Sequence, residues 1–263
     1  MNRIRAIIIK EWREVFKNKF VIFTVSFLPL MITALPLVTL YFTGGSEDFS
    51  GLSSADLPPQ FASLCGELSG GDCMLYYLVT QFILLFMMVP VIVPMTIASY
   101  SIVGEKTTRT LEPLLASPVS TLEILIGKGL AGVIPAVLST WGGYLLYAAG
   151  AFLMVDNRVV VSKLFDPVWM IAIFVVGPLL SLFGVSISVM ISSRVNDPRV
   201  AEQISGIFVL PVLGLFIGQM TGLILLNERF ILWMAAVLVI LDAVLFSFAI
   251  QVFQRETILS RWK

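Results

Sequence analysis

The chain has 263 residues, of which 58% are hydrophobic and only 13% charged, and its formal net charge is zero. Its mean hydropathy is +0.96. A soluble domain of this length cannot hide so much apolar surface, and a neutral chain has no electrostatic basis for binding nucleic acid. The composition therefore indicates an integral membrane protein.

Six apolar stretches of roughly 20 residues or more follow one another along the chain, and a helix of that length crosses about 30 Å of hydrocarbon. They predict an all-α fold with six transmembrane helices in a single domain over residues 1–263. The expected spans are 20–42, 76–102, 130–154, 168–191, 204–226 and 230–251. Prolines inside or near these spans predict kinks. They are Pro29, Pro36, Pro90, Pro94, Pro135, Pro178 and Pro211.

The basic residues that flank the spans predict their orientation, because Lys and Arg accumulate on the cytoplasmic side of a membrane protein. Fourteen of the 17 Lys and Arg residues lie in the N-terminal segment, in the segments after spans two and four, and in the C-terminal tail. Only Arg158, Lys163 and Arg229 lie on the opposite side. We therefore expect both termini in the cytoplasm, which also requires an even number of spans.

Residues 1–19 are expected to form an amphipathic helix before the first span. Its apolar positions, at helical spacing, are Ile4, Ile8, Trp12, Val15 and Phe16. Its opposite face carries Lys10, Arg13, Glu14 and Lys17. Such a helix lies in the membrane interface, with its apolar face towards the acyl chains. It is either a plain anchor that sets the topology or an elbow that carries force from a cytoplasmic partner into the first span.

Residues 43–75 form the longest segment outside the spans and carry five acidic residues without any Lys or Arg. The orientation places this segment on the outer side as a loop. It contains both cysteines of the chain, Cys65 and Cys73. Because the outer side is oxidising in many cells, we predict a Cys65–Cys73 disulfide that closes a small loop. The alternative is two free thiols without a role.

Residues 104–129 join spans two and three on the predicted cytoplasmic side. A short stripe of leucines is surrounded by charged residues, and Ser117-Pro118 predicts the end of a first helix. Ser120 and Glu123 have capping-box spacing, which predicts a second helix that continues into span three. Exposed leucines beside charges favour docking of another protein. An amphipathic connector that rests on lipid headgroups is the alternative.

The same segment resembles the signature of type-2 ABC exporter permeases, which reads roughly acid-basic-x-x-Gly-Thr-Leu-Glu, then a Leu pair, Ser-Pro and Gly-Lys. This chain has Glu105-Lys106-Thr107-Thr108-Arg109-Thr110-Leu111-Glu112, then Leu114-Leu115, Ser117-Pro118-Val119-Ser120 and Gly127-Lys128. It departs from the pattern at Arg109, where the family usually has glycine. The likeness also covers the plan of the whole chain: a basic amphipathic N-terminus, six spans and cytoplasmic termini.

The resemblance implies the membrane subunit of an exporter in a prokaryotic plasma membrane. It implies a dimer with a second copy or a related permease, and a separate ATPase subunit that binds ATP and Mg²⁺. It further implies a coupling helix over 105–118 seated in a groove of that ATPase, a substrate path at the dimer interface near spans two and five, and a short re-entrant helix within 219–227. The residues that it assigns to ATPase coupling are Glu105, Lys106, Arg109, Thr110, Leu111, Glu112, Leu114, Leu115 and Pro118.

No sequence pattern of a catalytic site occurs in this chain. It has no Gly-x-x-x-x-Gly-Lys-Ser/Thr pattern for nucleotides, no Gly-x-Ser-x-Gly pattern and no histidine, so we expect no cofactor or metal on this chain and no enzyme activity of its own. One ionisable residue, Asp242, lies inside a predicted span, where a charge is costly. It is either a pathway or proton-relay residue, or a neutral acid that fixes helix packing.

The sequence therefore predicts the permease subunit of an ATP-driven exporter that moves a lipid-like, hydrophobic or amphipathic substrate outward. Its expected partners are the ATPase, a second permease and membrane lipids. Two alternatives stay open at this point. One is a secondary transporter or channel that uses Asp242, and the other is a membrane scaffold subunit that transports nothing.

Overall fold

The computed structural model describes residues 2–43, 70–108, 110, 119–155, 157–224 and 226–252. The regular structure of these residues is entirely helical. Six stretches are long and apolar enough to cross a membrane: Lys19–Phe42, Gly71–Thr107, Thr121–Met154, Arg158–Ser192, Pro198–Met220 and Glu228–Gln251. The predicted all-α fold with six membrane-spanning helices is confirmed.

Three spans are single helices, and three are built from several helical elements. The single helices are α2 (Lys19–Thr43), α7 (Thr121–Met154) and α13 (Glu228–Val252). The second span joins α4 (Gly70–Phe86) to α5 (Val89–Thr107). The fourth runs through α8 (Arg158–Ser162), η3 (Lys163–Phe165), α9 (Pro167–Ile171), η4 (Ala172–Val176) and α10 (Gly177–Ser192). The fifth runs through α11 (Pro198–Gly206), η5 (Ile207–Val209) and α12 (Leu210–Met220).

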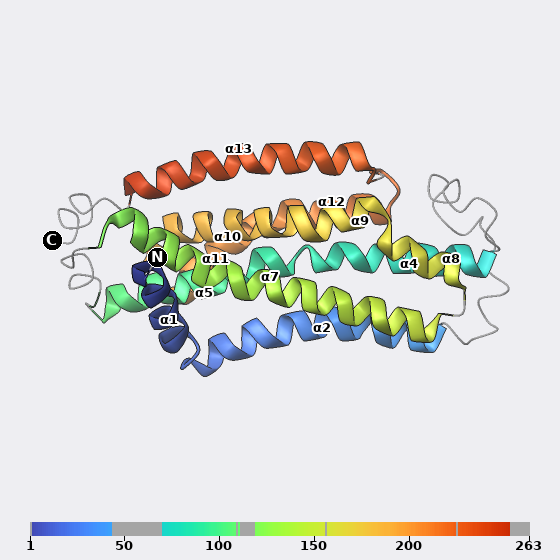
Figure 1. Ribbon diagram of the computed structural model, residues 1–263, viewed down its shortest axis with the longest axis horizontal. Coiled ribbons are helices and arrows are strands. Elements are labelled where there is room, and N and C mark those ends of the chain that lie inside the picture. Colours follow the sequence, from blue (N-terminus) through green and yellow to red (C-terminus); the bar gives the residue numbers. More distant parts are fainter. Residues whose placement is uncertain are drawn as a thin grey trace.

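The helix α1 (Asn2–Val15) precedes the spans and has a different direction. In Figure 1 the six spans run side by side along the long axis of the molecule, whereas α1 lies across them at the end where α13 finishes. The far end carries α8 and the start of α4. The molecule is thus a lengthwise helical bundle with one short helix docked across its base.

Two predicted segments are shorter than the sequence suggested. Because α5 continues to Thr107 and α7 already begins at Thr121, the segment expected over 104–129 is helical at both ends, and 108–120 alone connects the two spans. Because α4 begins at Gly70, Cys73 lies in a helix and not in the loop expected over 43–75. In both cases polar residues or glycines lie near the end of the helix, and the hydropathy pattern therefore placed that end too far inside the span.

The centre of the bundle is formed by α5 and α10, which pack on each other more extensively than any other pair of helices. Small residues let the two backbones approach: a Cβ atom added at Gly184 would lie only 2.8 Å from the carbonyl oxygen of Val91. Ser188 Oγ donates to the carbonyl oxygen of Met95 at 3.0 Å and lies 2.8 Å from Ser99 Oγ. Close contacts of small and hydroxyl-bearing residues hold membrane helices together, because lipid gives no hydrophobic force between them.

Prolines coincide with the breaks inside the three composite spans. Pro90 follows the turn at Met87 and Met88, Pro178 follows the π-helical η4, and Pro211 follows the 3₁₀ element η5. Proline has no N–H for the helical hydrogen bond, so the turn before it departs from α geometry. The predicted irregularities are confirmed at these three positions. The remaining four prolines lie inside continuous helices: Pro29, Pro36, Pro94 and Pro135.

The re-entrant helix expected within 219–227 is wrong for the residues that the structure describes there. After α12, Thr221 and Gly222 form a turn, and Gly222 has a φ of 72°, a left-handed conformation that glycine adopts without strain. Ile224 then donates its backbone N–H to the carbonyl oxygen of Gly218 at 3.0 Å. The chain therefore turns directly towards α13, which begins at Glu228.

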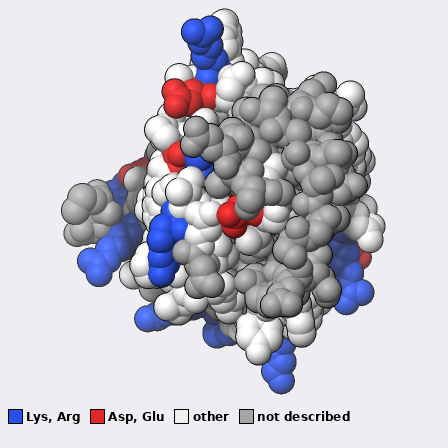
Figure 2. Space-filling view, turned by 90° about the vertical axis from the view of Figure 1, so that its right-hand side faces the viewer, with Lys and Arg blue, Asp and Glu red and all other residues white. Residues whose placement is uncertain are grey.

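The outer faces of α2, α12 and α13 are apolar and exposed. Large side chains on them, such as Phe23, Leu30, Ile217, Trp233 and Ile240, are 51–73% exposed. Figure 2 looks at the end of the bundle that carries α8, where the described Lys, Arg, Asp and Glu side chains lie mostly near the edge of the view. The long sides of the bundle thus present a surface suited to lipid or to another apolar protein surface.

Candidate functional site

The helix α1 is docked against the bases of two spans, α7 and α5. Trp12 donates its indole N–H to the carbonyl oxygen of Ala131 at 2.9 Å. Ile7 packs directly over Gly127, where an added Cβ would lie 2.7 Å from Ile7 Cγ2 and 2.9 Å from Ile7 Cβ. Only glycine at position 127 allows this approach, so the first half of the Gly127-Lys128 pair serves the docking of α1.

Lys128 follows on the next position of α7 and is 3% exposed. Its ammonium group has three partners within ion-pair or hydrogen-bond distance: Glu11 Oε1 at 2.7 Å, Glu105 Oε2 at 2.7 Å and Ser101 Oγ at 2.9 Å. An ammonium group carries three N–H donors, so these three acceptors match its full capacity. Glu11 also accepts a hydrogen bond from Ser101.

Lys10 of α1 is the remaining member of this group of charges and is partly exposed. Its ammonium pairs with Glu105 Oε1 and lies 3.6 Å from Glu14 Oε2. Burial lowers the pKa of Lys10, but the hydrogen bond and charge of Glu105, together with the charges of Glu11 and Glu14, outweigh burial and raise it above its ordinary value. Lys10 is therefore positively charged at neutral pH.

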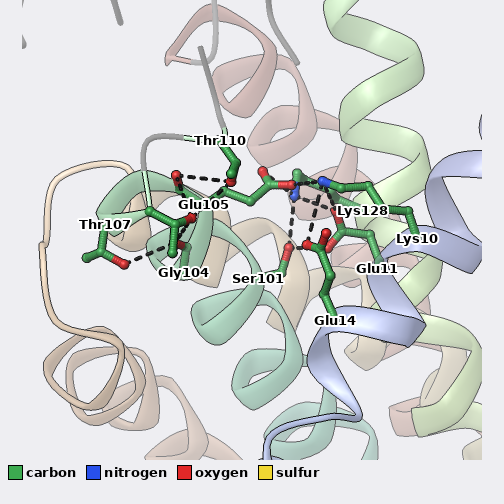
Figure 3. Close-up of polar contacts among 10 residues, drawn as sticks. Lys10, Glu11, Glu14, Ser101, Gly104, Glu105, Thr107, Thr110 and Lys128 are labelled. Atoms are coloured by element: carbon green, nitrogen blue, oxygen red, sulfur yellow. Dashed lines mark hydrogen bonds and ion pairs between the residues drawn. The ribbon is translucent and has the colours of Figure 1, made fainter. Parts of the chain in front are cut away.

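We call Lys10, Glu11, Glu105 and Lys128 the ion cluster; Figure 3 shows its contacts. It joins three helices, because the first two residues come from α1, the third from α5 and the fourth from α7. Two positive charges face two negative charges, so the cluster is neutral as a whole. Glu11, Glu105 and Lys128 are each at most 3% exposed. Removing one member of such a buried set leaves an uncompensated charge, which costs about 3–5 kcal/mol.

The cluster lies beside the 108–120 connection. Glu105 is in the last turn of α5, where Thr107 Oγ1 and Thr108 Oγ1 donate to the carbonyl oxygen of Gly104 at 3.0 and 2.8 Å. On the other side α7 begins with the predicted capping box, which is confirmed. Glu123 N–H donates to Ser120 Oγ at 3.2 Å, and Ser120 N–H donates to Glu123 Oε2 at 2.8 Å. Both ends of the connection are therefore fixed to helices that the ion cluster holds together.

A groove of about 510 Å³ lies next to the cluster, between the end of α1, the last turn of α5 and the start of α11. Glu105, Ser101 and Thr110 are among its lining residues. On the neighbouring side of α5, Lys106 donates to the carbonyl oxygens of Ser193 and Val195 at 3.3 and 3.1 Å, which ties α5 to the chain after α10. The base of the bundle is thus cross-linked by polar contacts around the 108–120 connection.

The structure describes three of the residues that the resemblance assigned to ATPase coupling. Glu105 points into the bundle and Lys106 is engaged at the end of α10, so neither presents its charge to a docking surface, whereas Thr110 is exposed. The others lie outside the described residues, and their assignment stays a prediction. They are Arg109, Leu111, Glu112, Leu114, Leu115 and Pro118.

Sequence reasoning missed Glu11 and Lys128 as members of a site. A signal was present for each. Glu11 lies four residues from Ile7 and from Val15, so it belongs to the apolar face of α1, where a charge needs a partner. Lys128 lies seven residues inside α7 among apolar residues. Their pairing required knowing that α1 folds back across α7, which no local pattern encodes.

Two further predicted residues lie elsewhere. Cys73 is fully buried against Met74, Tyr76 and Tyr77 and is not a free thiol, while Cys65 lies outside the described residues, so the Cys65–Cys73 pairing stays a prediction. Asp242 is 9% exposed in the middle of α13, and neither of its carboxyl oxygens has a hydrogen-bond partner in the described part of the chain.

These observations define a polytopic membrane protein whose first helix is ion-paired to the bases of its second and third spans. A family model described as ABC-2 family transporter protein matches residues 5–233, which is most of the chain and includes the ion cluster. The chain belongs to this family and is a membrane permease of an ABC transporter, a class of subunit that typically lacks its own nucleotide-binding site. A search of curated proteins finds no match.

Proposed function

We propose that this chain is the permease subunit of an ATP-driven exporter whose ATP and Mg²⁺ are bound by a separate ATPase subunit. Family membership supports the pairing with an ATPase and favours an ABC permease over a secondary transporter that works through Asp242. The chain also has no Gly-x-x-x-x-Gly-Lys-Ser/Thr pattern of its own. The energy for transport must then enter the chain through a contact with the partner.

That contact is the 108–120 connection, together with the last turn of α5. The ion cluster carries this part of the proposal, because it links both ends of the connection to α1 through contacts of 2.7 Å between buried charges. A push on the connection would move α5, α7 and α1 as one body, since separating any two of them exposes an unpaired buried charge. In this account α1 is an elbow in the membrane interface and not a plain anchor.

The charge distribution supports an orientation with the ion cluster and both termini in the cytoplasm. Fourteen of the 17 Lys and Arg residues lie in the N-terminal segment, in the segments after spans two and four, and in the C-terminal tail. Arg158, Lys163 and Arg229 belong to the opposite end. Together with the resemblance, this supports a location in the plasma membrane of a prokaryote, with the 43–75 region outside.

The exposed apolar faces support a dimer and an apolar cargo. Large apolar residues of α12 and of the elements before it, such as Ile207, Leu210 and Ile217, are 51–59% exposed, so the fifth span has an uncovered face on which a second permease can pack. We propose that the substrate leaves along this face as a lipid-like, hydrophobic or amphipathic molecule. Polar substrates would find few hydrogen-bond partners there.

The test of this function is the ratio of substrate moved to ATP hydrolysed. The permease is reconstituted in liposomes with the ATPase that co-purifies with it. In Glu105→Ala, which opens the ion cluster, and in Leu111→Asp, which places a charge on the predicted docking stripe, ATP hydrolysis should continue while transport falls at least about tenfold. Lys163→Gln is the control, because it removes a lysine of an exposed ion pair at the other end of the bundle. Unchanged transport in both variants would contradict the coupling role.

A further inference from the structure

A cavity of about 330 Å³ lies between α7, α10 and α13, apart from the ion cluster. Leu125, Leu130, Val185 and Phe246 are among its lining residues, and apolar side chains form nearly all of its wall. Its volume is in the range of sites that bind small molecules. Leu182 and Phe246, which also line it, are 41% and 36% exposed, so the cavity reaches the lipid-facing side of the bundle.

Asp242 is the one acidic residue among the cavity's lining residues, and no Lys or Arg is among them. Its side chain is more than nine-tenths buried, and both carboxyl oxygens lack a hydrogen-bond partner in the described part of the chain. Leaving such a group unpaired in an apolar site costs free energy that a bound donor would recover. The cavity thus offers an apolar wall and a buried carboxyl group whose hydrogen-bonding capacity is unmet in the described part of the chain.

The depth of Asp242 in the bundle limits which kinds of molecule can supply a hydrogen-bond donor to it. Asp242 lies ten residues before the end of α13 at Val252, which corresponds to about 15 Å along the helix axis. A phospholipid headgroup stays at the bilayer surface and does not reach this level. A molecule with an apolar chain and one small polar end does, because it dissolves in the hydrocarbon itself.

We propose that this cavity binds a lipophilic amine, a molecule with one apolar chain and a terminal amino group. The amino group pairs with Asp242 in either protonation state of the couple. An ammonium donates to the carboxylate, and a carboxylic acid donates to the neutral amine. The chain fills the space along Leu125, Leu130 and Val185 and leaves by the opening at Leu182. An anionic amphiphile is disfavoured, since its charge would face that of the acid. The site goes beyond the coupling function and does not depend on it, because binding needs neither ATP nor the partner.

The probes that test this site are a dodecylamine with a diazirine in its chain and the alcohol of the same chain. The permease alone is held in phosphatidylcholine nanodiscs, irradiated with each probe, and analysed by mass spectrometry of its peptides. We expect the amine to label the peptides around Leu182 and Phe246 at least about tenfold more strongly than the alcohol does, because a charge-assisted pair is about twice as strong as a neutral hydrogen bond. Equal labelling by both probes in the unmodified protein would overturn the proposal without any mutation.

Two variants locate the effect, and one serves as the matched control. Asp242→Leu should reduce amine labelling of these peptides about tenfold and alcohol labelling far less, so that the two probes label nearly equally, while Ser186→Phe should reduce both because it fills the cavity. Asp166→Asn removes a carboxylate at the other end of the bundle, outside the cavity, and should change nothing. Amine labelling that persists in Asp242→Leu would overturn the proposal. Since no ATPase is present, that result would leave the coupling function untouched.

Discussion

The ion cluster places four charges, three of them buried, in the packed base of the bundle. The arrangement is stable because each buried charge faces an opposite one and Ser101 supplies a further hydrogen bond. The stability of the ion cluster therefore depends on the presence of all of its charges. The pairs fix how α1 sits on the spans more than they add net stability, because a buried ion pair hardly exceeds the cost of taking its charges out of water.

A substitution of Lys128 tests whether the ion cluster needs all of its charges. In Lys128→Met, Glu11 and Glu105 stay buried without their shared cation, and the free energy of unfolding should fall by about 3–5 kcal/mol. The measurement is the denaturant- or heat-dependent loss of the monodisperse protein in detergent. Lys163→Met removes a cation whose pair with Asp166 spans 3.6 Å and is 38% exposed, so it should change stability by less than about 1 kcal/mol. Equal losses in the two variants would contradict the role of the ion cluster.

A second prediction for a single residue concerns Gly127, because this glycine allows the close contact between α1 and α7. In Gly127→Ala the new Cβ meets Ile7 at 2.7 Å and forces α1 away, which should cost about 1–3 kcal/mol and weaken the cluster. Gly142→Ala is the matched control on the same helix, since no atom lies within 4 Å of its added Cβ. The readout is hydrogen exchange of α1, which should speed up in the first variant alone. Equal exchange rates of α1 in the two variants would contradict the role of this contact.

The predictions made from sequence for individual residues agree with the structure to different degrees. Glu105 was chosen as a docking residue because its charge lies next to exposed-looking leucines, yet it faces inward to Lys128 and Lys10. Local sequence gives the residue types but not the direction in which the last turn of α5 points them. Asp242, by contrast, lies inside a span as predicted, and its carboxyl oxygens have no hydrogen-bond partner in the described residues.

At the scale of elements, the start of α7 determines how the 108–120 connection is attached. Ser120 caps the helix, and its replacement by alanine should cost about 1 kcal/mol and fray the first turn. Hydrogen exchange of residues 121–124 should then become faster, while transport per ATP falls in the reconstituted complex. Ser247→Ala is the control, since this hydroxyl only donates to the carbonyl oxygen of Ala243 within α13. If exchange at 121–124 stays the same in Ser120→Ala, the cap does not hold the helix start.

Sequence predicted the elements best where apolar runs are long and capping signals are strong. All six spans and the Ser120–Glu123 cap are present, because hydropathy and capping depend on neighbouring residues alone. Helix ends predicted from hydropathy alone were less accurate: α5 ends at Thr107, five residues after the predicted span end at 102, whereas the capping box correctly predicted the start of α7. The expected re-entrant helix was carried over from the family, and Gly222 turns the chain there instead.

At the scale of the whole molecule, the account requires both termini on the side of the ion cluster. Tags at residues 1 and 263 should be protected from protease in intact cells or right-side-out vesicles and cleaved after permeabilisation. A tag inserted within 44–69 should be cleaved in both conditions. Cleavage of a terminal tag from outside would reverse the orientation and would place the 108–120 connection away from any cytoplasmic ATPase.

The arrangement of the six spans relative to one another is the feature that the sequence predicted least well. The apolar character of the six spans says that they enter the membrane, but not that α10 is central or that α2, α12 and α13 are exposed. That order arises from contacts such as Gly184 against Val91 and Ser188 against Ser99, which match residues far apart in the chain. The same holds for the ion cluster, whose members come from positions 10, 11, 105 and 128.

The most direct test of the central claim, an ATP-driven permease, is a mild-detergent purification of the tagged chain from native membranes with mass spectrometry of its partners. We expect a stoichiometric soluble protein with a Gly-x-x-x-x-Gly-Lys-Ser/Thr motif, which crosslinks to residues 108–120. Absence of any such ATPase, even after crosslinking in intact membranes, would contradict the claim.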